Sequence, residues 1–421
     1  MEKLIIRGGN RLEGTVTLSG AKNSALKVLC ASILTSEKVK IFNMPTKMED
    51  VKVQIDMLKS IGAKVEIKGD MVFIDNSTIN RWDVSIDEGR SVRTSLLMLG
   101  SLLGRFRKAR VPLPGGCKIG ERKYDLHIYA LERLGAKVNE TSDGYIEADC
   151  CELKGAEVEF PNRTIGGTEN AILAACLAKG KTIIKNATIR PEVLDLVNFL
   201  NSMGAKIDVP GAGYIKIEGV SELHGTTYSI IPDPIEAFTF VIATIVTKGE
   251  VKIKPCPTSF IEVPIIYLRE SGVNFHLNGD TLKVNTIKRI TCLDIATSPY
   301  PGIFSDYQPF FTVFASQAEG VSRITDNIQP KRFQYAMELA RLGADVRVIG
   351  NTAIVKGPTH LKGAHVVAND LRGGAALAVA GLCAEGETVI DNVYQIDRGY
   401  EEIEKKLAKV GAKIERIKIK D

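Results

Sequence analysis

The chain has 421 residues, 44% of them hydrophobic and 25% charged, which is typical of a folded protein with two or three domains. This composition excludes a disordered or fibrous chain, and the mild net charge of +5 is too dispersed for nucleic acid, although it suits a small polyanionic substrate. The longest apolar run, 237–246, is shorter than the roughly 18 residues of a membrane span, and the N-terminus lacks a secretory apolar core. We therefore expect a cytoplasmic protein without a membrane partner.

An internal repeat of about 70 residues runs along the chain. Six blocks, from LKSIGAKVEI to LAKVGAKIER, each end an amphipathic helix at a glycine and then begin a strand of alternating polarity. The period exceeds that of solenoid repeats, so we expect each copy to be a small α/β subdomain. The six glycines, spaced 68 to 73 residues apart, are Gly62, Gly135, Gly204, Gly272, Gly343 and Gly411.

Each repeat also contains a second helix that is almost entirely apolar, such as NSALKVLCASIL, AFTFVIATIV and AALAVAGLC. A helix that is apolar on every side must be buried on every side. This pattern predicts two globular halves, each with three such helices inside a shell of amphipathic helices and small sheets. Pro232 and Pro234 interrupt regular secondary structure between the third and fourth repeats, where we expect the junction of the two halves.

The starts of three apolar helices carry cations, although the positive end of a helix favours acids. Lys22, Arg93 and Arg372 stand at equivalent repeat positions. If the helices of both halves point into one cleft, these cations and the free backbone N–H groups would bind a phosphate or carboxylate. The alternative is three solvated surface cations. The other repeats have Thr168, Glu169, Glu236 and Asp306 at this place.

A loop rich in glycine and proline, PLPGGCKIGERKYDLH, contains a single thiol at Cys117, close to Lys118 and Arg122. Nearby cations lower the pKa of a thiol, so the loop fits nucleophilic or acid/base chemistry as well as it fits an incidental surface cysteine. The eight cysteines include no C-x-x-C pair and the five histidines have no ligand spacing, so we expect reduced thiols and no metal.

Five segments, SGAKNSAL, PLPGGCKIGERKYDLHI, PYPGIFSDYQP, DLRGGAALAVAG and IDRGYEEIEKKLAKVGAKIE, together resemble the UDP-N-acetylglucosamine 1-carboxyvinyltransferases. This is a family of enolpyruvyl transferases in the EPSP synthase-like superfamily, and the resemblance spans essentially the whole chain. It implies an α/β fold of two inside-out barrels, each built from three repeated small α/β units, six repeats in all. It further implies that the N-terminal segment completes the second barrel, giving a first domain at 22–231, which carries the cysteine loop, and a second at 1–21 with 232–421.

The resemblance implies transfer of the enolpyruvyl group of phosphoenolpyruvate to the 3-hydroxyl of UDP-N-acetylglucosamine, with release of phosphate and without metal or organic cofactor. Cys117 would add to the enolpyruvyl carbon or protonate its methylene group. Lys22, Arg122 and Arg398 are implied to bind the phosphate and carboxylate of phosphoenolpyruvate. Arg93 and Arg372 would complete the cationic wall.

On the acceptor side, the resemblance implies that Asn23 holds the amino sugar and that Asp306 takes the proton of the 3-hydroxyl. The residues implied to complete the nucleotide-binding surface are Asp125, Leu126 and Ile328. Position alone favours a different interpretation, in which Asp306 is a helix N-cap and Arg398 is an ordinary surface arginine.

Four positions around the acceptor side depart from the pattern of this family. Pro234 replaces an arginine, Phe238 replaces a glycine at the start of an apolar helix, and Lys123 and Tyr124 replace a proline and a small aliphatic residue. Phe238 either crowds the sugar end of the site or fills core volume. Three interpretations stay open: a UDP-N-acetylglucosamine enzyme, a paralogue that uses another nucleotide acceptor, and a catalytically idle relative that binds a UDP-sugar.

Overall fold

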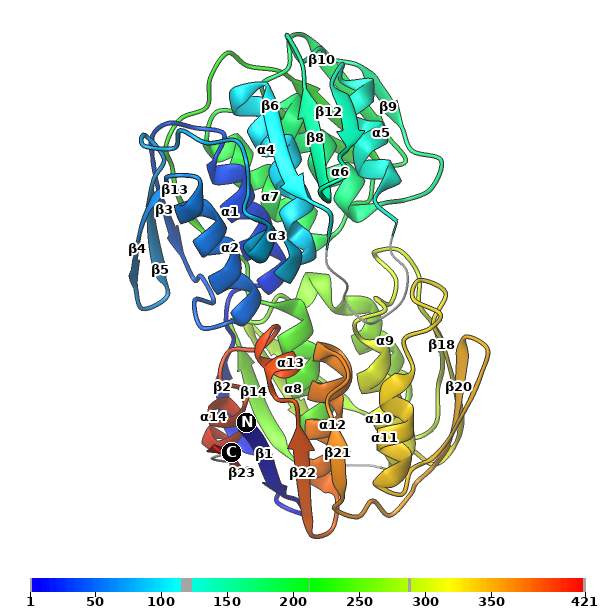
Figure 1. Cartoon of the computed structure of the whole chain (residues 1–421). Coiled ribbons are helices and arrows are strands. Elements are labelled where there is room, and N and C mark those ends of the chain that lie inside the picture. The colour runs from blue at the N-terminus through cyan, green and yellow to red at the C-terminus, as the bar shows by residue number, and fades with distance from the viewer. Residues whose placement is uncertain (1, 115–122, 212, 287–288, 419–421) are drawn as a thin grey trace.

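The computed structural model describes residues 2–114, 123–211, 213–286 and 289–418. Its buried hydrophobic side chains form two separate clusters, one from 21–230 and the other from 4–18 together with 235–412. Figure 1 shows the corresponding two lobes, with the N-terminal strands in blue beside the orange and red elements of the lower lobe. The predicted fold of two α/β barrel domains is confirmed.

Three apolar helices occupy the centre of each lobe, as the sequence predicts. Nearly every residue of these helices is buried. Within the described part of the chain, no helix has the length and apolar character needed to cross a membrane. The inner helices are α1 (Lys22–Ser32), α4 (Leu97–Phe106) and α6 (Ile165–Ala175) in the first lobe, and α8 (Pro234–Val246), α10 (Gln308–Gln317) and α12 (Leu371–Cys383) in the second.

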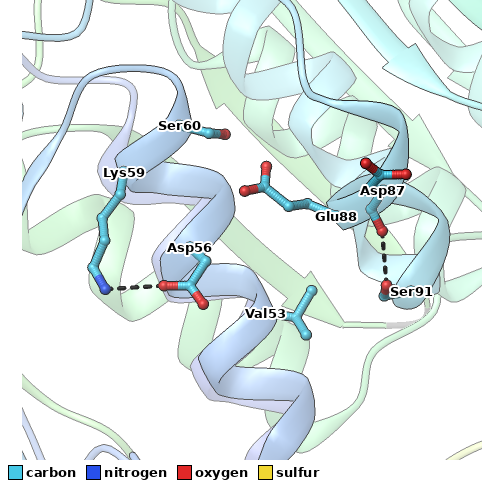
Figure 2. Close-up of a pocket in the computed structure, with 7 residues that line it drawn as sticks. All are labelled: Val53, Asp56, Lys59, Ser60, Asp87, Glu88 and Ser91. Carbon is cyan, nitrogen blue, oxygen red and sulfur yellow. Dashed lines mark hydrogen bonds and ion pairs between the residues drawn. The ribbon is translucent and has the colours of Figure 1, made fainter.

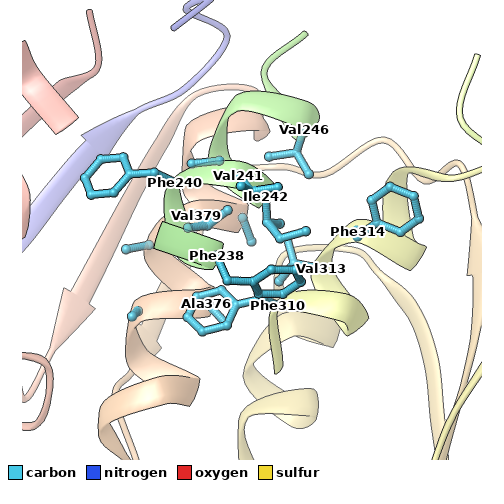
Figure 3. Close-up of a cluster of buried hydrophobic side chains, with 14 of the residues drawn as sticks. Phe238, Phe240, Val241, Ile242, Val246, Phe310, Val313, Phe314, Ala376 and Val379 are labelled. Atoms are coloured by element: carbon cyan, nitrogen blue, oxygen red, sulfur yellow. The ribbon is translucent and has the colours of Figure 1, made fainter. Parts of the chain in front are cut away.

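Phe238 belongs to the core between α8, α10 and α12 (Figure 3). Its side chain has no exposed surface, and its ring centre lies 4.6 Å from that of Tyr307 and 4.9 Å from that of Phe311. Of the two alternatives for Phe238, the structure therefore supports the one in which it fills core volume.

Six helices with one buried side surround the inner helices and end as the repeat predicts. Each is followed by one of the six repeat glycines, whose φ values of 93° to 109° favour glycine. The residue after each glycine donates a backbone hydrogen bond to the carbonyl of a leucine five positions earlier, at 3.0 to 3.3 Å, which is the Schellman motif. The outer helices are α2 (Glu49–Ser60), α5 (Asp125–Arg133), α7 (Pro191–Ser202), α9 (Glu262–Glu270), α11 (Gln334–Arg341) and α14 (Ile403–Lys409).

A strand begins two residues after each of these glycines and lies at the edge of a small sheet. These edge strands are β4 (Lys64–Lys68), β7 (Lys137–Glu140), β11 (Lys206–Gly211), β15 (Asn274–Asn278), β19 (Asp345–Ile349) and β23 (Lys413–Lys418). Their antiparallel neighbours are β5 (Met71–Asp75), β8 (Tyr145–Asp149), β12 (Tyr214–Glu218), β16 (Thr281–Asn285), β20 (Thr352–Gly357) and β1 (Glu2–Arg7).

The third strand of each sheet follows an inner helix and is antiparallel to the second. These strands are β3 (Lys38–Phe42), β6 (Lys108–Pro112), β10 (Lys181–Lys185), β14 (Glu250–Lys254), β18 (Gly320–Thr325) and β22 (Glu387–Asp391). In all sheets except that of β6, a fourth strand pairs in parallel with the third. The fourth strands are β13 (Thr227–Ser229), β9 (Glu157–Glu159), β2 (Glu13–Thr17), β17 (Asp294–Ala296) and β21 (His365–Val367).

The N-terminal segment contributes two strands to the second lobe. β1 lies between β22 and β23, with Leu4 opposite both Ile390 and Arg416, and β2 pairs with β14. Both termini accordingly lie in the same lobe (Figure 1). On this basis we propose the domain boundaries 22–231 for the first domain and 1–21 with 232–421 for the second.

Candidate active site

The chain passes between the two lobes twice, and these crossings place the start of α1 beside the start of α8. Gly20 forms an isolated bridge with Pro232, and a Cβ on Gly20 would lie 1.8 Å from the carbonyl oxygen of Asn43, so only glycine permits this approach. Asp233 caps α8, and its second carboxylate oxygen accepts a hydrogen bond from the backbone N–H of Lys22 at 3.2 Å. One carboxylate thus links both lobes at the first predicted cation.

Asp50 joins two of the predicted cations across the boundary between the lobes. Its Oδ2 lies 3.0 Å from Nζ of Lys22, the first residue of α1, and its Oδ1 accepts from Nε of Arg398 at 2.9 Å. Arg398 follows the short helix α13 (Tyr394–Asp397) in the second lobe, whereas Asp50 lies on α2 in the first. The side chains are 9%, 6% and 14% exposed for Lys22, Asp50 and Arg398. Arg398 is therefore not an ordinary surface arginine.

A second ion cluster surrounds Asp306, just before α10. Oδ1 of Asp306 accepts from Nη1 of Arg332 at 2.8 Å and lies 3.7 Å from Nε of Arg372. Nη2 of Arg332 donates to Asp370 at 3.3 Å, and Asp370 caps α12. The N-cap of α10 is Tyr307, so the position-based expectation that Asp306 is an N-cap is wrong.

Electrostatics connects these two clusters into one site. Burial lowers the pKa of Lys22, Asp50 opposes this shift, and the charges of Arg372 and Arg398 lower the pKa further. Burial alone would raise the pKa of Asp306, but its cationic neighbours hold it well below the usual range. Lys22 of the first lobe and Arg372 and Arg398 of the second therefore share one buried region with internal carboxylates.

Asn23 faces a small pocket between the lobes. The pocket is lined by residues of both lobes, among them Asn23, Arg190, Pro234 and Phe304. The predicted sugar-binding residue Asn23 and the departure at Pro234 thus share one pocket, whereas Phe238 is not among its lining residues.

The structure also places Arg93, a predicted cation of the donor side, beside the segment that holds two residues of the predicted nucleotide side. Arg93 begins the 3-10 helix η1 (Arg93–Leu96), which follows α3 (Ile86–Ser91), and its Nη2 donates to the carbonyl oxygen of Lys123 at 2.7 Å. Asp125, two residues after Lys123, begins α5, and Leu126 follows it. Asp125 is exposed and Leu126 is half-buried, so both remain accessible to a ligand.

Ile328 lies in an exposed loop that is tied to the Asp306 segment. Asp326 accepts a hydrogen bond from the backbone N–H of Ile328 at 3.0 Å and another from Ser305 Oγ at 2.6 Å. Cys117 and Arg122, the other two predicted residues, lie outside the described residues.

Two acids predicted near the starts of inner helices have structural partners. Glu236 is fully buried and pairs with Lys406 at 2.6 Å, while Glu169 lies one turn inside α6 and pairs with Lys27 at 3.4 Å. Lys22 and Arg372 are at helix starts, as expected.

Three charged residues of this site were not predicted from the sequence. These are Asp50 in its role as a bridge between two cations, Arg332 and Arg190. Arg190 is the N-cap of α7, so the rule that singled out Lys22, a cation at a helix start, would have found it. Arg332 precedes α11 without any repeat position or motif to mark it. Asp50 lies in the first turn of α2, where an acid is ordinary, so its position in the sequence does not indicate a bridge.

A second, open pocket lies between α2 and α3 (Figure 2). Three of its lining residues are the acids Asp56, Asp87 and Glu88, and its only lysine, Lys59, pairs with Asp56 at 2.9 Å. None of the predicted site residues lines it, and its charge disfavours a phosphorylated substrate.

Replacement of Asp50 by Asn tests the link between the lobes. Removing one partner of a buried ion pair leaves uncompensated charge, and we expect destabilisation of about 3–5 kcal/mol, measured as a lower melting temperature. Added inorganic phosphate is expected to raise the melting temperature of Asp50→Asn more than that of the parent, because an anion can take the place between Lys22 and Arg398.

The matched control is Asp56→Asn on the same helix, where the exposed pair with Lys59 contributes about 1 kcal/mol or less. Equal melting temperatures for the two variants, with equal responses to phosphate, would contradict the role of Asp50.

A family model described as EPSP synthase (3-phosphoshikimate 1-carboxyvinyltransferase) matches residues 6–407 of the chain. The chain is 44% identical over 419 residues to the UDP-N-acetylglucosamine 1-carboxyvinyltransferase of Thermodesulfovibrio yellowstonii, covering 99% of this chain and 100% of the relative. It is also 44% identical over 418 residues to the enzyme of the same name from Geobacter metallireducens, with the same coverage.

Two solved structures share the fold. The enolpyruvyl transferase NikO from Streptomyces tendae is 26% identical, with a TM-score of 0.89 and 99% coverage of both chains. EPSP synthase from Acinetobacter baumannii is 17% identical with a TM-score of 0.77, covering 99% of this chain and 100% of that one, which is a likeness of fold alone.

Proposed function

The chain belongs to the EPSP synthase family, and from this premise we propose that it transfers the enolpyruvyl group of phosphoenolpyruvate to the 3-hydroxyl of UDP-N-acetylglucosamine. Full-length relatives at 44% identity bear the name of this activity. The reaction is the first committed step of peptidoglycan synthesis, and we propose that the enzyme works in the cytoplasm, where it meets its two substrates.

The reaction is an addition followed by an elimination. The acceptor oxygen bonds to C2 of phosphoenolpyruvate while the methylene carbon gains a proton. The adduct then loses phosphate and a methyl proton, which restores the double bond. The protein must supply a base for the hydroxyl, an acid for the methylene carbon and cations for the departing phosphate.

One observation carries the proposal, the convergence of buried cations from both lobes on internal carboxylates. Lys22 and Arg398 meet at Asp50, and Arg332 and Arg372 meet at Asp306. Such a site suits a substrate that has both a phosphate and a carboxylate, because each cation can exchange an internal partner for a substrate oxygen.

We assign roles to the site residues accordingly. Lys22, Arg122 and Arg398 bind the phosphate and carboxylate of phosphoenolpyruvate, with Arg93, Arg332 and Arg372 completing the cationic wall. Asp306 accepts the proton of the 3-hydroxyl, and Cys117 adds to the enolpyruvyl carbon or protonates its methylene group. The acceptor is held by Asn23, Asp125, Leu126 and Ile328.

Phosphate release from phosphoenolpyruvate, assayed with a panel of nucleotide sugars, tests this function. We expect release with UDP-N-acetylglucosamine. Release only with another nucleotide would identify a different acceptor, and release with none of them would favour a UDP-sugar-binding protein without catalytic activity.

The variants Lys22→Ala and Arg398→Ala test the donor side. Each removes a charge-assisted contact of about 1.5–3 kcal/mol, so we expect phosphoenolpyruvate to bind about 10- to 100-fold more weakly. UDP-N-acetylglucosamine should bind nearly as in the parent, as titration calorimetry with each ligand separately would measure.

Lys59→Ala is the control, since Lys59 is an exposed lysine that pairs with Asp56 on the same helix. Equal losses of affinity for both ligands would mean that the two variants damage the whole site, and the donor assignment would be wrong.

A further inference from the structure

Arg190 reaches across the boundary between the lobes. It is the N-cap of α7 in the first lobe, and its guanidinium lies 4.0 Å from the ring centre of Phe304 in the second. Its side chain is only 13% exposed. Both residues line the pocket that also contains Asn23 and Pro234. A buried cation is therefore present in the pocket that contains Asn23, where Pro234 itself has no charge.

The hydrogen-bonding capacity of Arg190 is largely unused. Its Nε lies 3.1 Å from Oε1 of Glu192 in an ion pair, but this buried atom has no hydrogen bond of acceptable geometry. The two terminal nitrogens of Arg190 donate no hydrogen bond to any residue that the structure describes. Because a guanidinium has five N–H donors, most of them remain for a ligand.

An aromatic column connects Arg190 to the proposed base. Phe304 stacks on Tyr307 at 5.1 Å with an angle of 9° between the rings, and Tyr307 packs against the core residue Phe238 at 4.6 Å. Tyr307 directly follows Asp306, and the charge of Arg190 acts on Asp306 as well. The column thus positions the guanidinium relative to Asp306, the carboxylate to which we assign the role of base.

We propose that Arg190 determines acceptor specificity by binding an anionic group of the acceptor, the diphosphate of a uridine diphosphate sugar. Three features carry the inference: the position in the pocket with Asn23, the unused donors, and the rigid placement over Phe304. It rests on the proposed function for the identity of the acceptor. Arginine suits the task because its planar donor fork matches phosphate oxygens.

Binding measurements on Arg190→Gln and Arg190→Lys test the proposal, with UDP-N-acetylglucosamine, UDP, uridine and phosphoenolpyruvate as separate probes. For Arg190→Gln we expect about 10- to 100-fold weaker binding of UDP and UDP-N-acetylglucosamine, with uridine and phosphoenolpyruvate unchanged. In kinetics, the KM for the acceptor should rise far more than kcat falls. Arg190→Lys keeps the charge and should recover part of the affinity.

Arg81→Gln is the matched control, because Arg81 is an exposed arginine of the same lobe that pairs with Asp83. Unchanged binding of UDP by Arg190→Gln would overturn the inference, as would an equal weakening of UDP and uridine, which would indicate a structural role. A parent that turns over no UDP-N-acetylglucosamine would refute the proposed function alone, since the difference between UDP and uridine requires no turnover. A parent that binds neither UDP nor UDP-N-acetylglucosamine would overturn both.

Discussion

Asp306→Asn is expected to lower turnover by about 10²- to 10⁴-fold, because the amide cannot accept the proton of the acceptor hydroxyl. The side chain has nearly the same shape, so UDP-N-acetylglucosamine should still bind. Steady-state kinetics together with calorimetry of the acceptor would separate these two effects. The variant also removes the partner of Arg332 at 2.8 Å, so its melting temperature should be measured as well.

Asp294→Asn provides the control, since Asp294 forms an exposed ion pair with Arg323 in the same lobe at 3.1 Å. Its turnover and melting temperature should match those of the parent. If Asp306→Asn retained parental turnover, Asp306 would not be the base, and its ion pairs with Arg332 and Arg372 would be structural.

The environment of Asp306 also limits its role in pH dependence. Cations hold its pKa well below the usual range against the opposing effect of burial, so in the free enzyme it remains a carboxylate at every pH near neutrality. Any acidic limb in the pH profile of kcat/KM therefore belongs to another group. A carboxylate this well paired is a weak base, so acceptor binding must weaken its contact with Arg332 before the proton moves.

The repeats could be predicted from the sequence because their signals are local. A glycine at the end of an amphipathic helix and an apolar run need only neighbouring residues to be interpreted, and all six glycines have the expected positive φ. The cations at Lys22 and Arg372 could also be identified, since they break a rule about helix starts.

The partners of these cations could not be predicted, because they depend on how the two lobes dock. Asp50 and Arg398 are 348 residues apart in the chain, and neither position shows that one carboxylate joins both cations. Position alone also suggested an N-cap for Asp306, whereas Arg332 and Arg372 bind its carboxylate. The role of Arg190 becomes visible only with Phe304 of the other lobe beneath it.

The thiol of Cys117 can be tested against the other cysteines of the chain. Burial raises the pKa of Cys176, Cys256 and Cys383 to about 12, which leaves these thiols unreactive near neutral pH. Cys151 and Cys292 are exposed and serve as the controls. An alkylating epoxide should therefore modify Cys117 selectively and abolish turnover, and peptide mass analysis would identify the site.

Cys117→Ser is expected to lose turnover by about 10²- to 10⁴-fold while melting temperature and UDP-N-acetylglucosamine binding stay parental, because a hydroxyl neither adds readily nor protonates carbon. Cys117→Asp separates the two roles, since a carboxylic acid can donate a proton but cannot replace the sulfur nucleophile. We expect this variant to retain turnover and to resist the epoxide, as proton donation requires. A Cys117→Asp protein without turnover would favour the covalent role, and parental turnover in Cys117→Ser would refute both. Cys151→Ser should behave as the parent in every assay.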